Sequence, residues 1–281
     1  YIKFSSRNGG IMYDFYLGSK EEIEGNKEKY LLSIKRMMPK WMNSIPDSEF
    51  LALSRVADKV NEDGAVFVET GAGASSLVLL FHAMKNKGKL YSWDTNGEKI
   101  SRLRAVFNET ISRHFDMDIN KIWKPVTYNS TSQYAGISIL KELGEKVNLF
   151  FHDSEHVLDV VMGEIKEIKT LIKSPGLICL DDANYNFKHT NLAYINIVRK
   201  KLGLNPISDI EGNNGRYFFV EIEEFLNKNF KKVMKIKDSY KNEYIDDIYF
   251  QYFDTEFQIK AKMKMENKDL LGHRFDAWEV I

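Results

Sequence analysis

Short apolar runs alternate along the chain with longer amphipathic stretches, and most of the runs end in an acidic or other polar residue. The first run covers residues 65–68, and Glu69, a glycine-containing turn and a helical stretch follow it. The later runs cover residues 89–93, 125–128, 147–151 and 177–180. Runs this short, rich in apolar and β-branched residues, are typical of strands buried on both faces. Because helices join them, the order predicts an α/β fold with a doubly wound, mostly parallel sheet.

The chain of 281 residues is long enough for one large α/β unit with additions at both ends. Residues 1–47 are predicted to form an N-terminal helical arm that acts as a lid or a dimer contact. Residues 48–222, with a last expected strand at 217–222, form the α/β domain that binds the ligand. Residues 223–281 form a C-terminal extension that closes the sheet, with a strand near 277–281, or contributes to the substrate region.

The balance of charge excludes some partners. Forty Lys and Arg residues match forty Asp and Glu residues, so no global basic field attracts nucleic acid or anionic lipid. No apolar run is long enough to span a membrane, and we expect no membrane partner. The single cysteine, Cys179, cannot form an intrachain disulfide, which fits a reducing, cytoplasmic location. Methionines at helical spacing in residues 37–42 indicate core packing or a contact in a homo-oligomer.

A glycine turn and a later acid point to the kind of ligand. Gly71 and Gly73 lie between the first strand and its helix, where glycine lets the backbone approach a ligand closely. A tight structural turn is the alternative. Asp94 follows Gly73 by 21 residues, at the end of the second strand, where a carboxylate can accept hydrogen bonds from both ribose hydroxyls. The pair predicts an adenosine-containing ligand, which leaves a dinucleotide and S-adenosylmethionine (SAM) both open.

Glu69 separates these two ligands. A carboxylate two residues before Gly71 would lie where a dinucleotide places its pyrophosphate, and two anions in a partly dry cleft repel each other strongly. The sulfonium and the α-amino group of SAM are positively charged instead. Glu69 therefore favours SAM over the cofactor of a NAD-dependent oxidoreductase, which is the alternative enzyme class.

The segment from Glu69 to Ser75 resembles the first motif of class I SAM-dependent methyltransferases, which have a Rossmann-like fold. In that family the glycine turn contacts the methionine part of SAM, and the acid after the second strand holds the ribose. A polar turn after the third strand lies near the adenine. The cofactor-binding residues that the resemblance implies here are Glu69, Gly71, Gly73, Ser75, Asp94 and Ser130.

Two later motifs are similar to those of small-molecule O-methyltransferases of the macrocin and cephalosporin pathways. The first is Asp153-Ser154-Glu155-His156 after the fourth strand, and the second is the pair Asp181-Asp182 after the fifth. The resemblance covers residues 65–185. It departs from the family at Ser154, which replaces the usual glycine, and at Leu158, where an aromatic residue is frequent. In those enzymes the corresponding acids bind a divalent metal.

Asp153, Asp181 and Asp182 are hard oxygen donors at adjacent strand ends, which suits Mg²⁺ or another divalent cation. Alternatively, Asp182 caps the next helix and Asp153 only orders its loop. His156 is the candidate general base, with Asp153 as the second catalytic residue, since an imidazole can take the proton of an attacking hydroxyl. The alternative is that His156 only caps a helix or forms a hydrogen bond with Asp153.

The predicted activity is transfer of the methyl group of SAM to a hydroxyl oxygen, assisted by a divalent metal. The acceptor is expected to be a small polar molecule, such as a sugar or a hydroxylated natural product. Besides the oxidoreductase, the alternative is a non-catalytic protein that binds an adenosine-containing ligand. Fold alone does not identify the acceptor.

Overall fold

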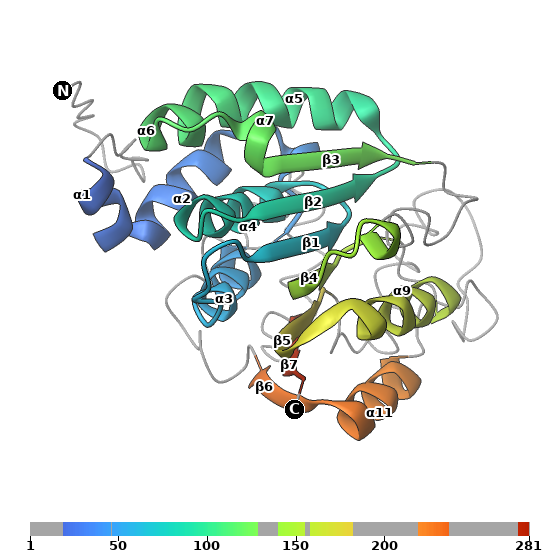
Figure 1. Cartoon of the computed structure of the whole chain (residues 1–281). Helices are drawn as coiled ribbons and strands as arrows, with labels where there is room; N and C mark the ends of the chain where they lie inside the picture. The colour runs from blue at the N-terminus through green and yellow to red at the C-terminus, as the bar shows by residue number, and fades with distance from the viewer. Residues whose placement is uncertain are drawn as a thin grey trace, which may run out of the picture.

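A computed structural model describes residues 19–45, 47–128, 140–154, 158–181, 219–235 and 275–280. These residues contain one seven-stranded sheet with the order β3-β2-β1-β4-β5-β7-β6 (Figure 1). The strands from β1 to β5 pair in parallel, whereas β7 runs antiparallel to both β5 and β6. The strands are β1 (Val66–Thr70), β2 (Lys89–Asp94), β3 (Trp123–Thr127), β4 (Val147–His152), β5 (Ile172–Leu180), β6 (Lys231–Lys235) and β7 (Asp276–Glu279).

Helices cover both faces of this sheet, as the predicted doubly wound α/β fold requires. Those on one side include α3, α4 and α5, and α9 packs with α11 on the other. The helices are α1 (Lys20–Gly25), α2 (Lys27–Met37), η1 (Lys40–Met42), α3 (Asp47–Ala57), α4 (Ala74–Lys85), α5 (Gly97–Phe107), η2 (Asn108–Ser112), α6 (Arg113–Phe115), α7 (Ile119–Ile122), α9 (Leu158–Leu171) and α11 (Phe219–Asn229). In the part of the chain that is described, no helix is long and apolar enough to cross a membrane.

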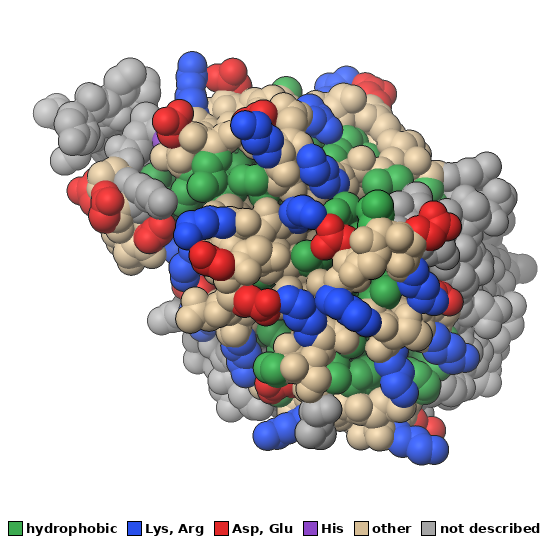
Figure 2. Space-filling view, in the orientation of Figure 1, with side chains coloured by type: hydrophobic (Ala, Val, Ile, Leu, Met, Phe, Trp, Pro, Cys, Tyr) green, Lys and Arg blue, Asp and Glu red, His purple; other side chains and the backbone are tan. Residues whose placement is uncertain are grey.

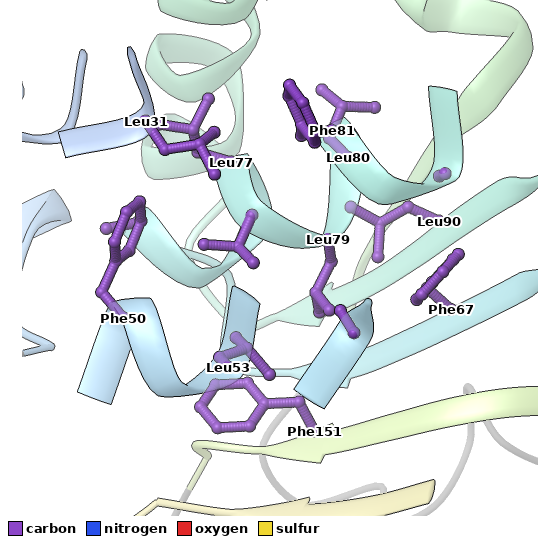
Figure 3. Packing of buried hydrophobic residues seen from close by; sticks show 14 of the residues in the cluster. Leu31, Phe50, Leu53, Phe67, Leu77, Leu79, Leu80, Phe81, Leu90 and Phe151 are labelled. Atoms are coloured by element: carbon purple, nitrogen blue, oxygen red, sulfur yellow. The ribbon is translucent and has the colours of Figure 1, made fainter. Parts of the chain in front are cut away.

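The two faces of the sheet build two apolar cores. Side chains alternate along a strand, so Phe67 and Val68 of β1 enter different cores, and both are fully buried. Phe67 belongs to the core that contains Leu79 of α4, part of which Figure 3 shows. Val68 belongs to the core that contains Ile165 of α9. Burial on both faces explains why β1 is continuously apolar until Glu69.

The C-terminal part of the chain differs in one respect from the expected strands. Residues 219–222, expected to end a strand, begin helix α11. Ile222, Leu226 and Phe230 recur every four residues and are buried, which is the spacing of a helix that packs one face on its neighbour α9. The strand expected near 277–281 is confirmed as β7, which pairs with β5. With β6 it extends the sheet at the edge beyond β5.

Charged side chains of both signs are interspersed over the face of the molecule in Figure 2. This face shows no block of a single sign, in keeping with the equal numbers of acidic and basic residues in the chain. Among the described residues, acidic and basic side chains form partly exposed ion pairs such as Lys89 with Glu145 and Lys173 with Glu62. Pairs of this kind contribute little to stability, and they leave no strong field for a polyanion.

Candidate functional site

The carboxyl ends of β1, β2 and β4 meet at one edge of the sheet. Thr70 of β1 is in register with Trp93 of β2 on one side and with His152 of β4 on the other, so the residues that follow these strands are neighbours. A pocket of about 270 Å³ lies at this edge. The described residues of its wall are Gly71, Trp93, Asp94, Thr95, Lys99, Tyr128, Asp153, Ser154, Val160 and Glu164.

Gly71 has two reasons to be glycine. Its φ of +89° lies in the region that side chains disfavour. A Cβ atom at this position would also lie 1.9 Å from the carbonyl oxygen of Asp153. The close approach is therefore to the loop after β4, and it brings the glycine turn and that loop together on the pocket wall.

Asp94 is held at the end of β2 by backbone donors. The amide of Ala72 donates to its Oδ2 at 2.9 Å, and the amide of Asn96 donates to its Oδ1 at 2.7 Å. Lys99 Nζ lies 2.6 Å from Oδ2 and also lines the pocket. The carboxylate is thus fixed at the pocket wall, where the ribose of an adenosine-containing ligand was expected.

Glu69 lies behind the glycine turn, with its side chain fully buried and absent from the pocket wall. Its Oε2 accepts a hydrogen bond from Ser75 at 2.8 Å, and its Oε1 accepts hydrogen bonds from Ser92 at 2.5 Å and from Ser76. Burial raises the pKa of Glu69 to about 7, against the lowering effect of these hydroxyls. Glu69 supports the turn, so its predicted repulsion of a pyrophosphate does not follow from its position.

The pKa of Glu69 predicts a pH dependence of stability. Between pH 4.5 and about 7 the folded protein keeps a proton that the unfolded chain releases, so the free energy of unfolding falls as pH rises through this window. For this group the fall is on the order of 3 kcal/mol and is complete above pH 7. Urea unfolding of the wild type and of Glu69→Gln at pH 5 and pH 8 measures it. A difference between the two proteins that does not change with pH would contradict the raised pKa.

A second buried carboxylate, Glu164 of α9, reaches the pocket from the other side of the sheet, and 4% of its residue surface is exposed. Its Oε2 accepts a hydrogen bond from Thr70 Oγ1 at 2.7 Å and lies 2.7 Å from His152 Nδ1. Its Oε1 accepts a hydrogen bond from Ser154 Oγ at 3.1 Å. The serine that departs from the resembled motif therefore has a structural partner. The cluster ties α9 to the ends of β1 and β4.

The sequence predictions and the pocket agree in part. Gly71, Asp94 and Asp153 line the pocket together. Sequence reasoning missed Lys99 and Glu164 as pocket residues. A signal for Glu164 was available, because it lies four residues after Val160 and four before Ile168, on the buried face of α9.

Other predicted residues lie elsewhere. Gly73 caps helix α4 and Ser75 lies in its first turn, and neither residue lines the pocket. A Cβ atom built on Gly73 would lie 3.3 Å from the carbonyl oxygen of Met42 in η1. The N-terminal arm thus reaches the glycine turn. Three further predicted residues fall outside the described residues, namely Ser130, His156 and Asp182.

The predicted metal ligands are described only in part. Asp153 and Asp181 follow neighbouring strands, and the amide of Asp181 donates to the carbonyl oxygen of His152 at 2.9 Å. The oxygen donors fit a hard cation in their chemistry. Among the described residues, no three His, Cys, Asp or Glu side chains lie close enough together to hold a metal ion. Asp182 is not among the described residues. The metal stays a prediction.

Comparison with known families bears on the segment that holds this pocket. Residues 68–183, less than half of the chain, match a family model described as a methyltransferase domain. This segment is similar to methyltransferase domains. It spans β1 to β5 and thus the ends of the strands that form the pocket wall. The match favours the methyltransferase prediction over the oxidoreductase. A search of curated proteins finds no match to the chain.

Solved structures share the fold. An O-methyltransferase from Bacillus cereus in complex with SAH has a TM-score of 0.50 at 10% identity, over 93% of this chain and 96% of that chain. Cofactor-bound Rv0187 from MTB has a TM-score of 0.51 at 10% identity, over 89% of this chain and 87% of that chain. At this identity the likeness concerns the fold, and it agrees with the predicted Rossmann-like architecture around the methyltransferase domain.

Proposed function

We propose that this methyltransferase domain takes a methyl group from SAM and transfers it to a hydroxyl oxygen of a small polar acceptor. The observation that carries the choice of SAM is the charge of the pocket wall. Asp94, Asp153 and Glu164 contribute three carboxylates to it, and Lys99 contributes one ammonium group. An excess of negative charge in a partly closed pocket attracts the cationic sulfonium and repels a pyrophosphate. The electrostatic preference for SAM over a dinucleotide, which the sequence analysis based on Glu69, therefore rests on these three carboxylates.

The orientation of SAM follows from where each group lies. Asp94 offers a carboxylate for the ribose hydroxyls, and Trp93 and Tyr128 of the neighbouring strands offer aromatic surface to a purine. The methionine part then extends toward Gly71, Asp153 and the end of β4. The fold does not identify the methyl acceptor. We therefore keep the expectation of a sugar or a hydroxylated natural product, which comes from the sequence motifs.

The chemistry is an in-line displacement. The acceptor oxygen forms a bond to the methyl carbon while the bond between that carbon and sulfur breaks, and the electron pair stays on sulfur in S-adenosylhomocysteine (SAH). The protein's task is to align oxygen, carbon and sulfur, since the sulfonium is already a good leaving group. The hydroxyl proton passes to a base, for which His156 is the candidate from the sequence, with Asp153 as the second catalytic residue.

Binding of the cofactor tests the first half of this proposal. Isothermal titration calorimetry of the full chain with SAM, SAH and NADH should give saturable binding for SAM and SAH only. Saturation with NADH and none with SAM would overturn the proposal. Binding of SAM without transfer of labelled methyl to any of a broad panel of hydroxylated molecules would instead favour the non-catalytic alternative.

The metal part of the proposal has its own test. Asp153 and Asp181 would hold a divalent cation with Asp182, and a bound cation would lower the pKa of an acceptor hydroxyl. We expect excess EDTA, or Asp182→Ala, to reduce methyl transfer by about 100-fold while the Kd for SAH changes less than about threefold. Excess Mg²⁺ should restore the EDTA-treated wild type and leave the variant inactive. Equal turnover with and without EDTA would reject the metal.

A further inference from the structure

Glu164 combines burial with access to the pocket. It is nearly inaccessible to solvent, yet it belongs to the pocket wall beside Gly71, Asp153 and Ser154. A buried carboxylate is costly unless hydrogen bonds or an opposite charge compensate for the lost water. The contacts of Glu164 with the end of β1, the end of β4 and the loop after β4 supply part of this compensation.

The two oxygens of Glu164 are occupied unequally. Oε2 has contacts with Thr70 and His152, whereas Oε1 has only the hydrogen bond from Ser154 among the described residues. Each carboxylate oxygen can accept two hydrogen bonds. Oε1 therefore has room for one more donor, and the adjoining pocket is where a ligand would supply it.

The charge of that donor follows from the other side chains of the pocket. The ammonium group of Lys99 lies 2.6 Å from Asp94, at the ribose end, and the other described residues of the wall include no further Lys or Arg. A cationic donor on the ligand would form a charge-assisted hydrogen bond with Glu164, which is stronger than a neutral one. A fixed carboxylate of this kind selects an ammonium group over a hydroxyl.

We propose that Glu164 binds the α-ammonium group of SAM and SAH through Oε1, and so fixes the methionine end of the cofactor; this inference rests on the proposed function. The ribose at Asp94 directs the methionine part toward the β4 side of the pocket, where Glu164 lies. The sulfonium has no N–H, whereas the α-ammonium group has three. Thr70 and His152 contact the other oxygen, Oε2, so the carboxylate of Glu164 is oriented before the cofactor binds.

A cycle of two ligands and two proteins tests this pairing. The ligands are SAH and desamino-SAH, in which hydrogen replaces the α-amino group, and the proteins are the wild type and Glu164→Gln. In the wild type we expect SAH to bind about 10- to 100-fold more tightly than desamino-SAH. In Glu164→Gln the ratio of the two Kd values should fall below about threefold, because the charge that distinguishes the ligands is gone.

Glu69→Gln is the matched control. Glu69 is also a buried carboxylate with three hydroxyl donors at the same glycine turn, but it does not line the pocket. Its substitution should weaken both ligands by the same factor and keep the wild-type ratio. If Glu164→Gln also keeps that ratio, Glu164 has only a structural role and the inference is wrong.

The wild type provides a readout that does not depend on the folding of any variant. Equal affinity of the wild type for SAH and desamino-SAH would overturn the role of Glu164 and leave the proposed function intact. No binding of SAH to the wild type would overturn the proposed function itself. Should Glu164→Gln fail to fold, Glu164→Asp keeps the charge but withdraws it by one methylene, and an undiminished ratio there would overturn the inference.

Discussion

Gly71→Ala is expected to lose roughly 3–5 kcal/mol of stability and all measurable binding of SAH. The new Cβ would lie 1.9 Å from the carbonyl oxygen of Asp153 and 2.6 Å from its carbonyl carbon. Both are backbone atoms, so the clash is relieved only if the loop after β4 moves away from the end of β1. The positive φ adds strain. Urea unfolding and calorimetry with SAH measure the two effects.

Gly144→Ala separates the two causes. Gly144 also has a positive φ, of +68°, but nothing lies within 4 Å of a Cβ built there. Its substitution should cost only about 1–2 kcal/mol and leave the affinity for SAH unchanged. If the two variants are equally stable, the close approach of the glycine turn to the loop after β4 is not what requires Gly71.

Asp94→Asn is expected to weaken SAH binding by about 100-fold and to lower the free energy of unfolding by about 1–3 kcal/mol. The backbone amides of Ala72 and Asn96 donate to different oxygens of Asp94, so the single amide oxygen of Asn leaves one of them without its acceptor. The substitution also removes the charge that strengthens hydrogen bonds to two ribose hydroxyls. Calorimetry with SAH gives the loss in affinity, and urea unfolding shows whether the turn is intact.

A ligand without one of the hydroxyls identifies the cause of this loss. The 2′-deoxy analogue of SAH should bind the wild type more weakly than SAH, and the difference should shrink in Asp94→Asn. Asp63→Asn, at an exposed acid paired with Lys87 far from the pocket wall, should bind both ligands as the wild type does. An unchanged preference for SAH in Asp94→Asn would mean that Asp94 supports the turn without contacting ribose.

The predictable part of the fold is the part with a local signal. The mainly apolar runs at residues 65–68 and 147–151, the second interrupted by Asn148, are strands because helices bury them on both faces of the sheet. Their short length and composition already indicate this in the sequence. Residues 219–222 contain the same kinds of side chain but form the first turn of α11. A short apolar segment fits either structure until its packing partner, here α9, is known.

The candidate site shows the same division. Asp94 was predictable because its spacing from the glycine turn reflects one strand–helix–strand unit. The place of Glu69 was not, since the sequence does not reveal that three serine hydroxyls surround it behind the turn. The spacing of Glu164 from Val160 and Ile168 placed it on the buried face of α9, but not at the pocket. An acid on an amphipathic helix normally faces water, and only the contacts of α9 with the ends of β1 and β4 bring it to the pocket.

By itself the sequence determined the order of strands and helices from β1 to β5, the glycine turn and the acids that follow these strands, because hydrophobic period and residue spacing encode these features locally. The tertiary structure alone decided which carboxylates line the pocket. Asp94, Asp153 and Glu164 come from elements that are far apart along the chain, and only the pairing of the strands and the packing of α9 place them around one pocket, with Glu69 behind it.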